Sequence, residues 1–375
     1  MVSSLPGDTP ATGSGPGHDA GHGAGHDAGH GAGQPFDWGD YVAWLVERHG
    51  SLAAVAEALA AQRGYAEAQG SIERGLRRLR TRGARDGGIW GLRALRAFGV
   101  PDDVDSRVRW MGQYHTRFSD LPRSICLELL RPWDRPPVSE SPLRAWVQLG
   151  LAGVALRGRE REQAGEHLRQ AERAAAGLSR LEWLLAQVFW LGRDGLHQAE
   201  ALMSEAEGLT ESLPMSDDDR ACYRARCVDH RGWVHNRIER DHATARDLYA
   251  ALPREGPPFA RVRRDNGLGW SLLRLGDTEG ARACARRAIE AAGDGGSLRL
   301  RVMALSLLAA TVEGDEAKAV RRRAAEIAER LDDEVLRVRL ARHRGGGRDV
   351  GPRDPSGARG AERGVDPNEN AHNSG

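Results

Sequence analysis

The chain has 375 residues, of which 40% are hydrophobic and 29% charged, so a large part of it can fold around apolar cores. Its 54 basic and 53 acidic residues nearly cancel, so the whole-chain charge singles out neither a nucleic-acid-binding nor a strongly acidic protein. No stretch approaches the roughly 18 apolar residues of a membrane span, no signal peptide is visible, and four cysteines without a CxxC pair favour a reduced, cytoplasmic setting.

Residues 1–36 are rich in glycine, proline, serine, alanine and histidine, and contain the unit HDAGHGAG twice. The repeat spaces four histidines at intervals of four: His18, His22, His26 and His30. This spacing would gather them on one face only in a helix, where each intervening glycine costs roughly 1 kcal/mol against alanine. We therefore expect a disordered tail without a metal site of fixed geometry. Loose chelation of zinc, nickel or copper by the four histidines is the alternative.

Residues 37–130 are expected to form a small helical domain. Apolar side chains recur at intervals of three and four in 42–49, 51–62 and 71–83, which predicts three short helices. Ser51 and Ser71 are natural N-caps, and glycines follow two of the predicted helix ends.

The third predicted helix is amphipathic in an unusual way. Ile72, Leu76 and Leu79 share one face, and arginines take up the rest. From residue 71 to residue 98 there are eight arginines against Glu73 and Asp86, a local charge of +6 in a nearly neutral chain. Such a helix suits phosphate and guanine edges, because the arginine fork bonds both.

The pattern S-I-x-R-x-L-x-x-L-x-x-x-G at 71–83 resembles the recognition helix of winged helix-turn-helix DNA-binding domains. The resemblance implies contact with duplex DNA through Ser71, Arg74, Arg77, Arg78, Arg80 and Arg82. It also places a wing at residues 84–99, although LRALRAF within that stretch is equally compatible with a helix. One alternative is a solvated arginine-rich helix, or one that pairs with acids such as Asp102, Asp103 and Asp105. Another is a helix whose arginines meet an acidic protein surface.

Four prolines make residues 131–142 a stiff connector, followed by a longer unit at 143–343. Similar stretches recur in that unit, each preceded by a turn and headed by an alanine: Ala164, Ala199, Ala245, Ala281 and Ala319. Their spacings are 35, 46, 36 and 38 residues. The longest spacing is expected to need a longer turn around LPMSDDD, at 213–219.

The best copy, NGLGWSLLRLGDTEGARACARRAIEAAG at 266–293, resembles the tetratricopeptide repeat, a helix pair of about 34 residues. Leu268 and Gly269 match the family's Leu-Gly, and Ala281 and Ala288 match its small second-helix positions. The resemblance implies an α-solenoid whose concave face binds a protein or polar peptide. By family register that face would include His230, Arg237, Arg263 and Asn266. A plain helical bundle is the alternative.

No phosphate loop, HExxH or GxSxG motif is visible, so we expect neither an enzyme nor a cofactor. Residues 344–375 have the composition of a second disordered tail. The expected fold is all-α, with a helix-turn-helix-like domain before a tetratricopeptide-like solenoid. The expected function is that of a regulator that binds duplex DNA and a protein or peptide partner, with no membrane. The alternative is a scaffold that binds protein only.

Overall fold

A computed structural model describes residues 36–62 and 67–345. These residues form 17 α-helices, several short 3₁₀ or π turns and no strand, which confirms the all-α class. No helix among them has the length and apolar character to cross a membrane. The predicted tails, 1–36 and 344–375, lie outside the described residues except at their inner edges, as do the four tail histidines.

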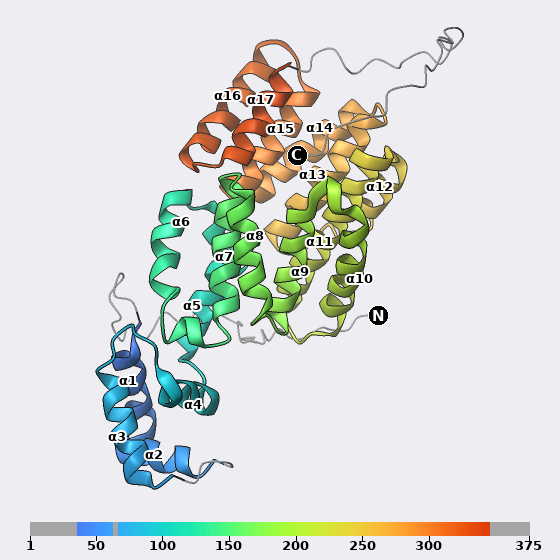
Figure 1. Ribbon diagram of the computed structural model, residues 1–375. Helices are drawn as coiled ribbons and strands as arrows, with labels where there is room; N and C mark the ends of the chain where they lie inside the picture. Colours follow the sequence, from blue (N-terminus) through green and yellow to red (C-terminus); the bar gives the residue numbers. More distant parts are fainter. Residues whose placement is uncertain (1–35, 63–66, 346–375) are drawn as a thin grey trace, which may run out of the picture. The chain divides into compact units, whose positions relative to one another are not determined.

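The first five helices of the described chain end before residue 113 (Figure 1). They are α1 (Trp38–His49), α2 (Leu52–Ala60), α3 (Gln69–Arg80), α4 (Gly88–Phe98) and α5 (Asp102–Gly112). The first three pack on one another around fully buried side chains: Trp38, Tyr41, Leu45, Leu59, Ile72, Leu76 and Leu79. The predicted apolar faces are therefore the faces that the fold buries.

The ends of these helices test the predicted caps. The Ser51 hydroxyl accepts a hydrogen bond from the Ala54 amide at 3.1 Å, which confirms Ser51 as the N-cap of α2. The prediction for Ser71 is wrong, because α3 starts earlier, at Gln69, and places Ser71 inside its first turn. The side-chain amide of Gln69 donates to the Ala53 carbonyl at 3.3 Å, which ties this added turn to α2.

The stretch expected to carry a wing forms the helix α4 instead. Two close contacts hold α4 against the first helices. A Cβ at Gly75 would lie 2.4 Å from the Trp90 ring, and one at Gly91 would lie 2.7 Å from the Trp38 ring. Because glycine has no Cβ, the Trp90 and Trp38 rings can pack directly on the helix backbone at these two positions. Helix α4 thus occupies the stretch that a wing would have formed as a β-hairpin.

Residues 113–142 connect this unit to the helix pairs. They contain η1 (Arg117–Asp120), α6 (Arg123–Leu130), η2 (Arg131–Trp133) and η3 (Val138–Glu140). No α-helix crosses 131–142, in keeping with its four prolines.

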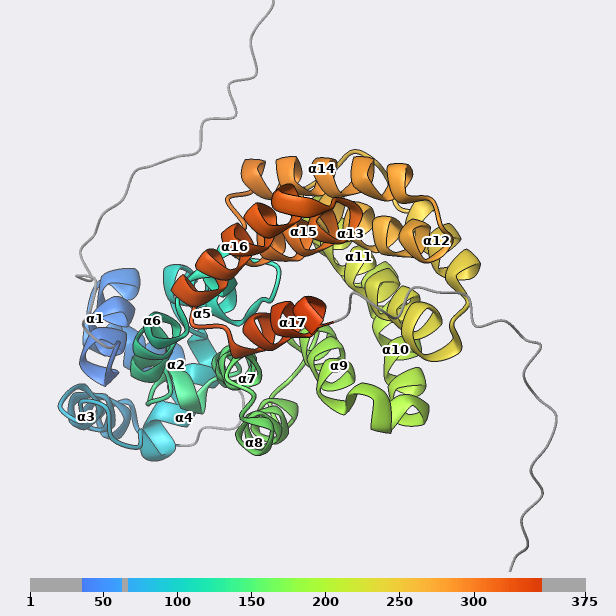
Figure 2. The same ribbon diagram turned by 90° about the horizontal axis from the view of Figure 1, so that it is seen from above.

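Helix pairs then follow one another along the chain (Figures 1 and 2). The pairs are α7 (Arg144–Arg157) with α8 (Arg161–Glu172), α9 (Leu178–Leu191) with α10 (Leu196–Ser212), α11 (Asp217–Val234) with α12 (His242–Ala250), α13 (Pro258–Arg274) with α14 (Thr278–Asp294), and α15 (Leu298–Thr311) with α16 (Gly314–Arg330). The last helix, α17 (Glu334–Gly345), packs on α15 and α16 and also reaches α7.

A buried alanine holds the fourth place of every second helix. Ala164, Ala199, Ala245 and Ala281 are all buried there, as the spacing predicts. In the fifth pair the prediction of Ala319 is wrong, because that side chain is exposed. The fourth place of α16 belongs to Ala317, which lies 36 residues after Ala281 and is 2% exposed.

The 46-residue interval between Ala199 and Ala245 has a different cause from the one expected. The connection between α10 and α11 is only residues 213–216, and Ser216 already caps α11 by accepting from the Asp219 amide at 3.1 Å. The extra length lies in the helices: α10 has 17 residues, α11 has 18, and a π turn, η5 (His235–Glu239), extends α11.

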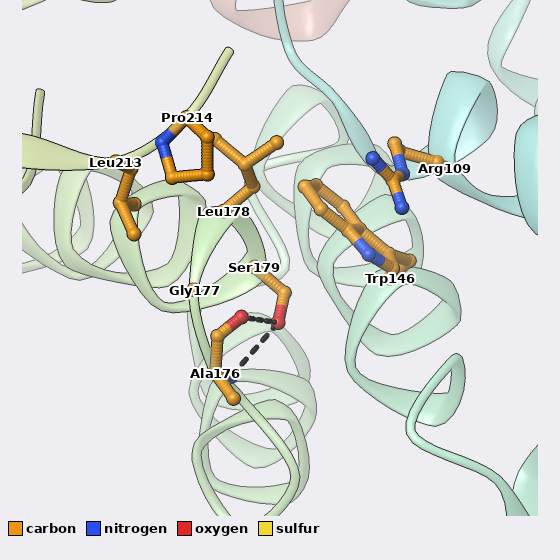
Figure 3. Close-up of a pocket in the computed structure, with 8 residues that line it drawn as sticks. All are labelled: Arg109, Trp146, Ala176, Gly177, Leu178, Ser179, Leu213 and Pro214. Carbon is orange, nitrogen blue, oxygen red and sulfur yellow. Dashed lines mark hydrogen bonds between the residues drawn. The ribbon is translucent and has the colours of Figure 1, made fainter.

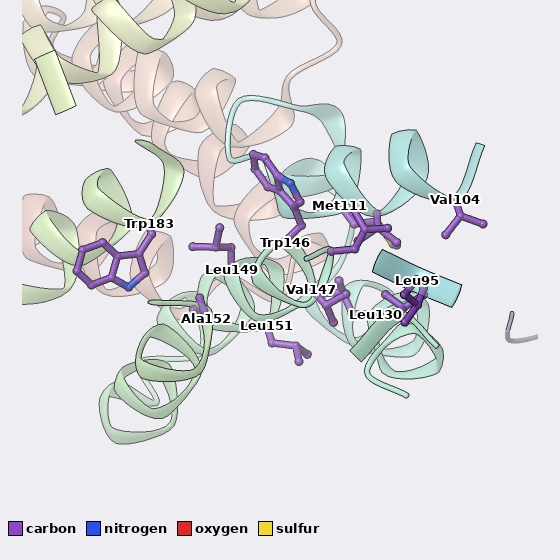
Figure 4. Packing of buried hydrophobic residues seen from close by; sticks show 14 of the residues in the cluster. Leu95, Val104, Met111, Leu130, Trp146, Val147, Leu149, Leu151, Ala152 and Trp183 are labelled. Atoms are coloured by element: carbon purple, nitrogen blue, oxygen red, sulfur yellow. The ribbon is translucent and has the colours of Figure 1, made fainter. Parts of the chain in front are cut away.

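One apolar core runs from the first helix into the helix pairs, with members from Phe36 to Cys227. Figure 4 shows its middle, where Leu95 and Met111 lie beside Leu130 and the Trp146 side chain of α7. The described residues from Phe36 to Gly345 accordingly belong to one compact unit.

Candidate functional site

Helix α3 separates apolar from basic side chains. Ile72, Leu76 and Leu79 are buried against α1, α2 and α4. The five arginines predicted to meet DNA are all exposed: Arg74, Arg77, Arg78, Arg80 and Arg82. The fold therefore gathers them on one helix and its C-terminal end, with the half-buried Ser71 in the first turn.

Most of these guanidinium groups have no acidic partner. Arg77 pairs with Glu73 one turn away, and Arg82 lies 3.8 Å from Asp86. Within the described part of the chain, Arg74, Arg78 and Arg80 make no ion pair. Since exposed pairs contribute about 1 kcal/mol or less, all five arginines are available to an anionic surface.

The four residues predicted to bind a partner do not gather at one pocket. Arg263 and Asn266 are each 6% exposed. His230 is half-buried and Arg237 is exposed. No ion pair links Arg237 to a described residue. Although the side chain is exposed overall, partial desolvation of its guanidinium, together with the nearby charges of Arg274 and Arg339, lowers its pKa.

Arg263 belongs to a polar network around Tyr114, which stands in the segment between α5 and η1. The Arg263 guanidinium donates to the Tyr114 hydroxyl at 2.8 Å and to Asp229 at 2.6 Å. Arg226 and Arg299 stand over the same phenol ring, 5.0 Å and 5.6 Å from its centre. Three consecutive first helices, α11, α13 and α15, thus each supply one arginine to Tyr114.

These arginines change the acidity of the phenol. Burial alone would raise the pKa of Tyr114, but Arg263, Arg299 and Arg226 outweigh it and lower the pKa to about 8. The site therefore favours negative charge at the position of the phenol oxygen.

Residues 113–120 make further polar contacts with the same helices. The Tyr114 amide donates to Glu182 of α9 at 3.3 Å, and Glu182 also pairs with Arg226 at 2.7 Å. His115 lies 3.0 Å from Asp219 of α11. We call the side of α9, α11, α13 and α15 that contacts residues 113–120 the inner face.

A second group of buried charges joins the two ends of the array. Asp333, immediately before α17, is completely buried and pairs with Arg299 at 2.8 Å and Arg157 of α7 at 3.3 Å. Arg157 also donates to the Leu331 carbonyl at 2.8 Å. Asp120 accepts from the Arg299 amide at 2.8 Å, which brings the end of the 113–120 segment into the same group.

Sequence reasoning singled out Arg263 but missed the rest of this network. One signal was present: Arg226, Arg263, Arg299 and Arg339 follow at intervals of 37, 36 and 40 residues, close to the repeat length. Tyr114, Glu182 and Asp333 carry no comparable signal, because each stands alone in its own stretch of sequence.

Two surface pockets lie elsewhere. The first, of about 240 Å³, is formed by Arg109, Trp146 and the loops before α9 and α11 (Figure 3). The second, of about 390 Å³, lies beside the π turn and is lined by three histidines, His197, His230 and His235, together with Glu200 and Glu239. His235 lies 2.6 Å from Glu239, and burial lowers the pKa of His230, which leaves that ring neutral at pH 7.

No cluster of three metal-ligating side chains occurs in 36–62 or 67–345. The four cysteines are all buried thiols. Burial raises the pKa of Cys222 to about 12 and that of Cys227 to about 11, so neither supplies a thiolate near neutral pH.

No protein-family model, curated protein or solved structure matches the chain. The function of the protein is therefore inferred from its own residues and their arrangement.

Proposed function

We propose that this protein is a non-enzymatic, DNA-binding regulator. Its N-terminal helices α1–α4 act as a helix-turn-helix-like unit, and its helix pairs act as a tetratricopeptide-like array that binds a protein or peptide partner. The observation that carries the proposal is the exposed arginine face of α3, three of whose arginines lack an acidic partner among the described residues.

The geometry of α3 suits the major groove of duplex DNA. Its leucine face is fixed by the core, so its arginines project from a rigid support rather than from a loop. Arginine bonds both phosphate oxygens and the guanine edge in a bidentate manner. A helix with four exposed arginines, and Arg82 just after its end, is therefore suited to both non-specific and specific contacts.

The repeat-like part of the proposal rests on close helix packing. A Cβ at Gly269 of α13 would lie 2.4 Å from the Leu307 side chain of α15 and 3.1 Å from the Cys284 Cβ of α14. The small residue at this place, the buried alanines of the second helices and the turn at Gly276, with φ 89°, all support a tetratricopeptide-like array.

Duplex binding by the full chain at 50 to 200 mM salt tests the DNA-binding part. Affinity should fall steeply with salt, because each phosphate contact releases condensed counterions. The double variant Arg74→Ala/Arg78→Ala should lower affinity at least tenfold. It should also reduce the slope of log K against log salt by about one for each of the two arginines that meets a phosphate in the wild type. Fluorescence anisotropy with a labelled duplex measures both quantities.

The matched control is Arg286→Ala/Arg322→Ala, which removes two exposed arginines of the outer helices α14 and α16. It should leave duplex affinity within twofold of wild type. Equal losses in both double variants would mean that general charge, not α3, drives binding.

A protein-only scaffold is the second candidate, favoured by one observation. Helix α4, packed beside α3, exposes Ile89 at 58% and Leu92 at 42%, and exposed apolar side chains suit a protein surface. If no duplex binds even at 50 mM salt, the arginines of α3 serve an acidic protein surface instead.

A further inference from the structure

Residues 113–120 cross the inner face as a bound peptide would. Gln113 contacts Tyr223 of α11 at 3.3 Å, Tyr114 contacts α9 and α13, and Asp120 accepts from Ser297 at 2.9 Å at the start of α15. The segment thus contacts four first helices, through a turn at 114–116 and the 3₁₀ helix η1 that follows it. Binding surfaces of repeat proteins likewise extend over several consecutive repeats.

The first half of the segment is held by recognition contacts more than by apolar burial. Residues 113–116 are only half-buried, whereas core residues such as Leu76 and Leu168 are fully buried. Their partners are charged or hydroxyl groups on the helices: Glu182, Asp219, Tyr223 and Arg263. The Tyr114 and His115 rings also pack against Phe259 of α13. Charge-assisted hydrogen bonds and cation–π contacts specify an occupant and leave residues 113–116 exchangeable, whereas Phe118, 3% exposed, holds the second half of the segment in the apolar core.

We propose that the inner face is a peptide-binding surface whose resident in the free protein is the chain's own 113–120 segment. The partner that fits it is a peptide that forms a turn around a tyrosine, whose phenol meets the arginines of α11, α13 and α15 as Tyr114 does. This inference deepens, and rests on, the proposed partner-binding role of the helix pairs.

The segment that a partner peptide would replace lies at the junction between the N-terminal helices and the helix pairs. Residues 113–120 directly follow α5 and so connect the arginine-bearing unit to the array. A partner peptide that takes the place of Tyr114 displaces residues 113–116 of this connection, while α5 stays packed on α7.

The test uses the full chain and a fluorescein-labelled peptide of residues 111–121, followed by fluorescence anisotropy. Tyr114→Ala empties the arginine site while its surroundings remain. This variant should bind the peptide at least tenfold more tightly than wild type, whose tethered segment competes at high effective concentration. The same peptide with alanine in place of its tyrosine should bind Tyr114→Ala at least tenfold more weakly.

Circular dichroism establishes that Tyr114→Ala is folded. If it is not, the double variant Gln113→Ala/His115→Ala decides. It removes the polar contacts of the segment to Tyr223 and Asp219 and keeps the phenol in place. It should bind the peptide at least threefold more tightly than wild type. Equal binding by wild type and the folded variant, or equal binding of both peptides, overturns the inference.

Duplex binding is measured on the same proteins to separate the two proposals. Persistent duplex binding without peptide binding overturns the inner-face inference alone. Peptide binding without duplex binding overturns the DNA-binding proposal and leaves the inner face as the functional surface.

Discussion

The N-terminal helices and the inner face use arginine in opposite ways. In α3 the apolar side chains are buried and arginines such as Arg78 stand in solvent without an acidic partner among the described residues. On the inner face Arg263 is buried, and it contacts both a carboxylate and a phenol. The same residue type therefore offers charge outward in one region and organises a buried polar network in the other.

The difference shows what a buried charge requires. A charge removed from water must be paired and hydrogen-bonded, and loss of one partner leaves the other uncompensated. An exposed pair such as Arg77 with Glu73 is solvated whether or not it forms. Substitutions of buried charges should therefore cost stability, whereas substitutions of the exposed arginines of α3 should cost function.

The largest effect is expected at Asp333, which serves both Arg157 and Arg299. Asp333→Ala leaves two arginines without their buried carboxylate and removes the acceptor for the Leu336 amide. We expect a loss of about 3–5 kcal/mol in the free energy of unfolding, measured by urea denaturation.

The control for this experiment is Asp315→Ala. Asp315 is 97% exposed and pairs only with the exposed Lys318. Its loss should change the free energy of unfolding by less than about 0.5 kcal/mol. Similar losses in the two variants would contradict the contrast between buried and exposed pairs.

A smaller effect is expected where α3 meets α4. Gly75→Ala places a methyl group 2.4 Å from the Trp90 ring, and the strain should exceed the helix-propensity gain, for a net loss of about 2 kcal/mol. Gly153→Ala in α7 meets nothing within 4 Å and should instead stabilise by up to about 1 kcal/mol. Thermal melts of both variants compare the two glycines, and a stabilised Gly75→Ala would refute the close contact.

The smallest effect concerns Tyr114 and pH. Its pKa is lowered from 10.0 to about 8, so the folded protein binds fewer protons than the unfolded chain between these values. The stability that Tyr114 contributes is therefore fully present above pH 10 and is lost as the pH falls through 8. Between about pH 7 and pH 9 it should add about 1 kcal/mol to the free energy of unfolding.

Absorbance near 295 nm measures the ionisation of the Tyr114 phenol directly. One of the five tyrosines should titrate near pH 8 in wild type and none in Tyr114→Phe. Titration of all five tyrosines at or above pH 10 would show that the arginines do not act on the phenol as the geometry indicates.

Local sequence features predicted much of the helical framework. Ser51 caps α2 as predicted, because a cap needs only a hydroxyl near its own helix. Regular spacing found the buried alanines of four second helices but chose Ala319 over Ala317 in the fifth. The choice failed because α16 starts at Gly314, and a helix start shifted by two residues turns a different side chain inward.

The sequence predicted the arginine face of α3 better than it predicted the Tyr114 site, for a related reason. The arginine face of α3 lies within one helix, so periodicity alone placed all five arginines in solvent. The Tyr114 site combines side chains from four separate helices and a connecting segment. Only the recurrence of Arg226, Arg263 and Arg299 near the repeat length hinted at it.

By itself the sequence determined the all-α class, the basic helix and the positions of most turns, because these depend on side chains within a few residues of one another. The tertiary structure alone decided that α4 replaces a wing, that Gly75 is needed against Trp90, and that Tyr114 fills the inner face. These features depend on which distant segments meet. Their energy comes from packing and charge pairing between helices, which no local pattern records.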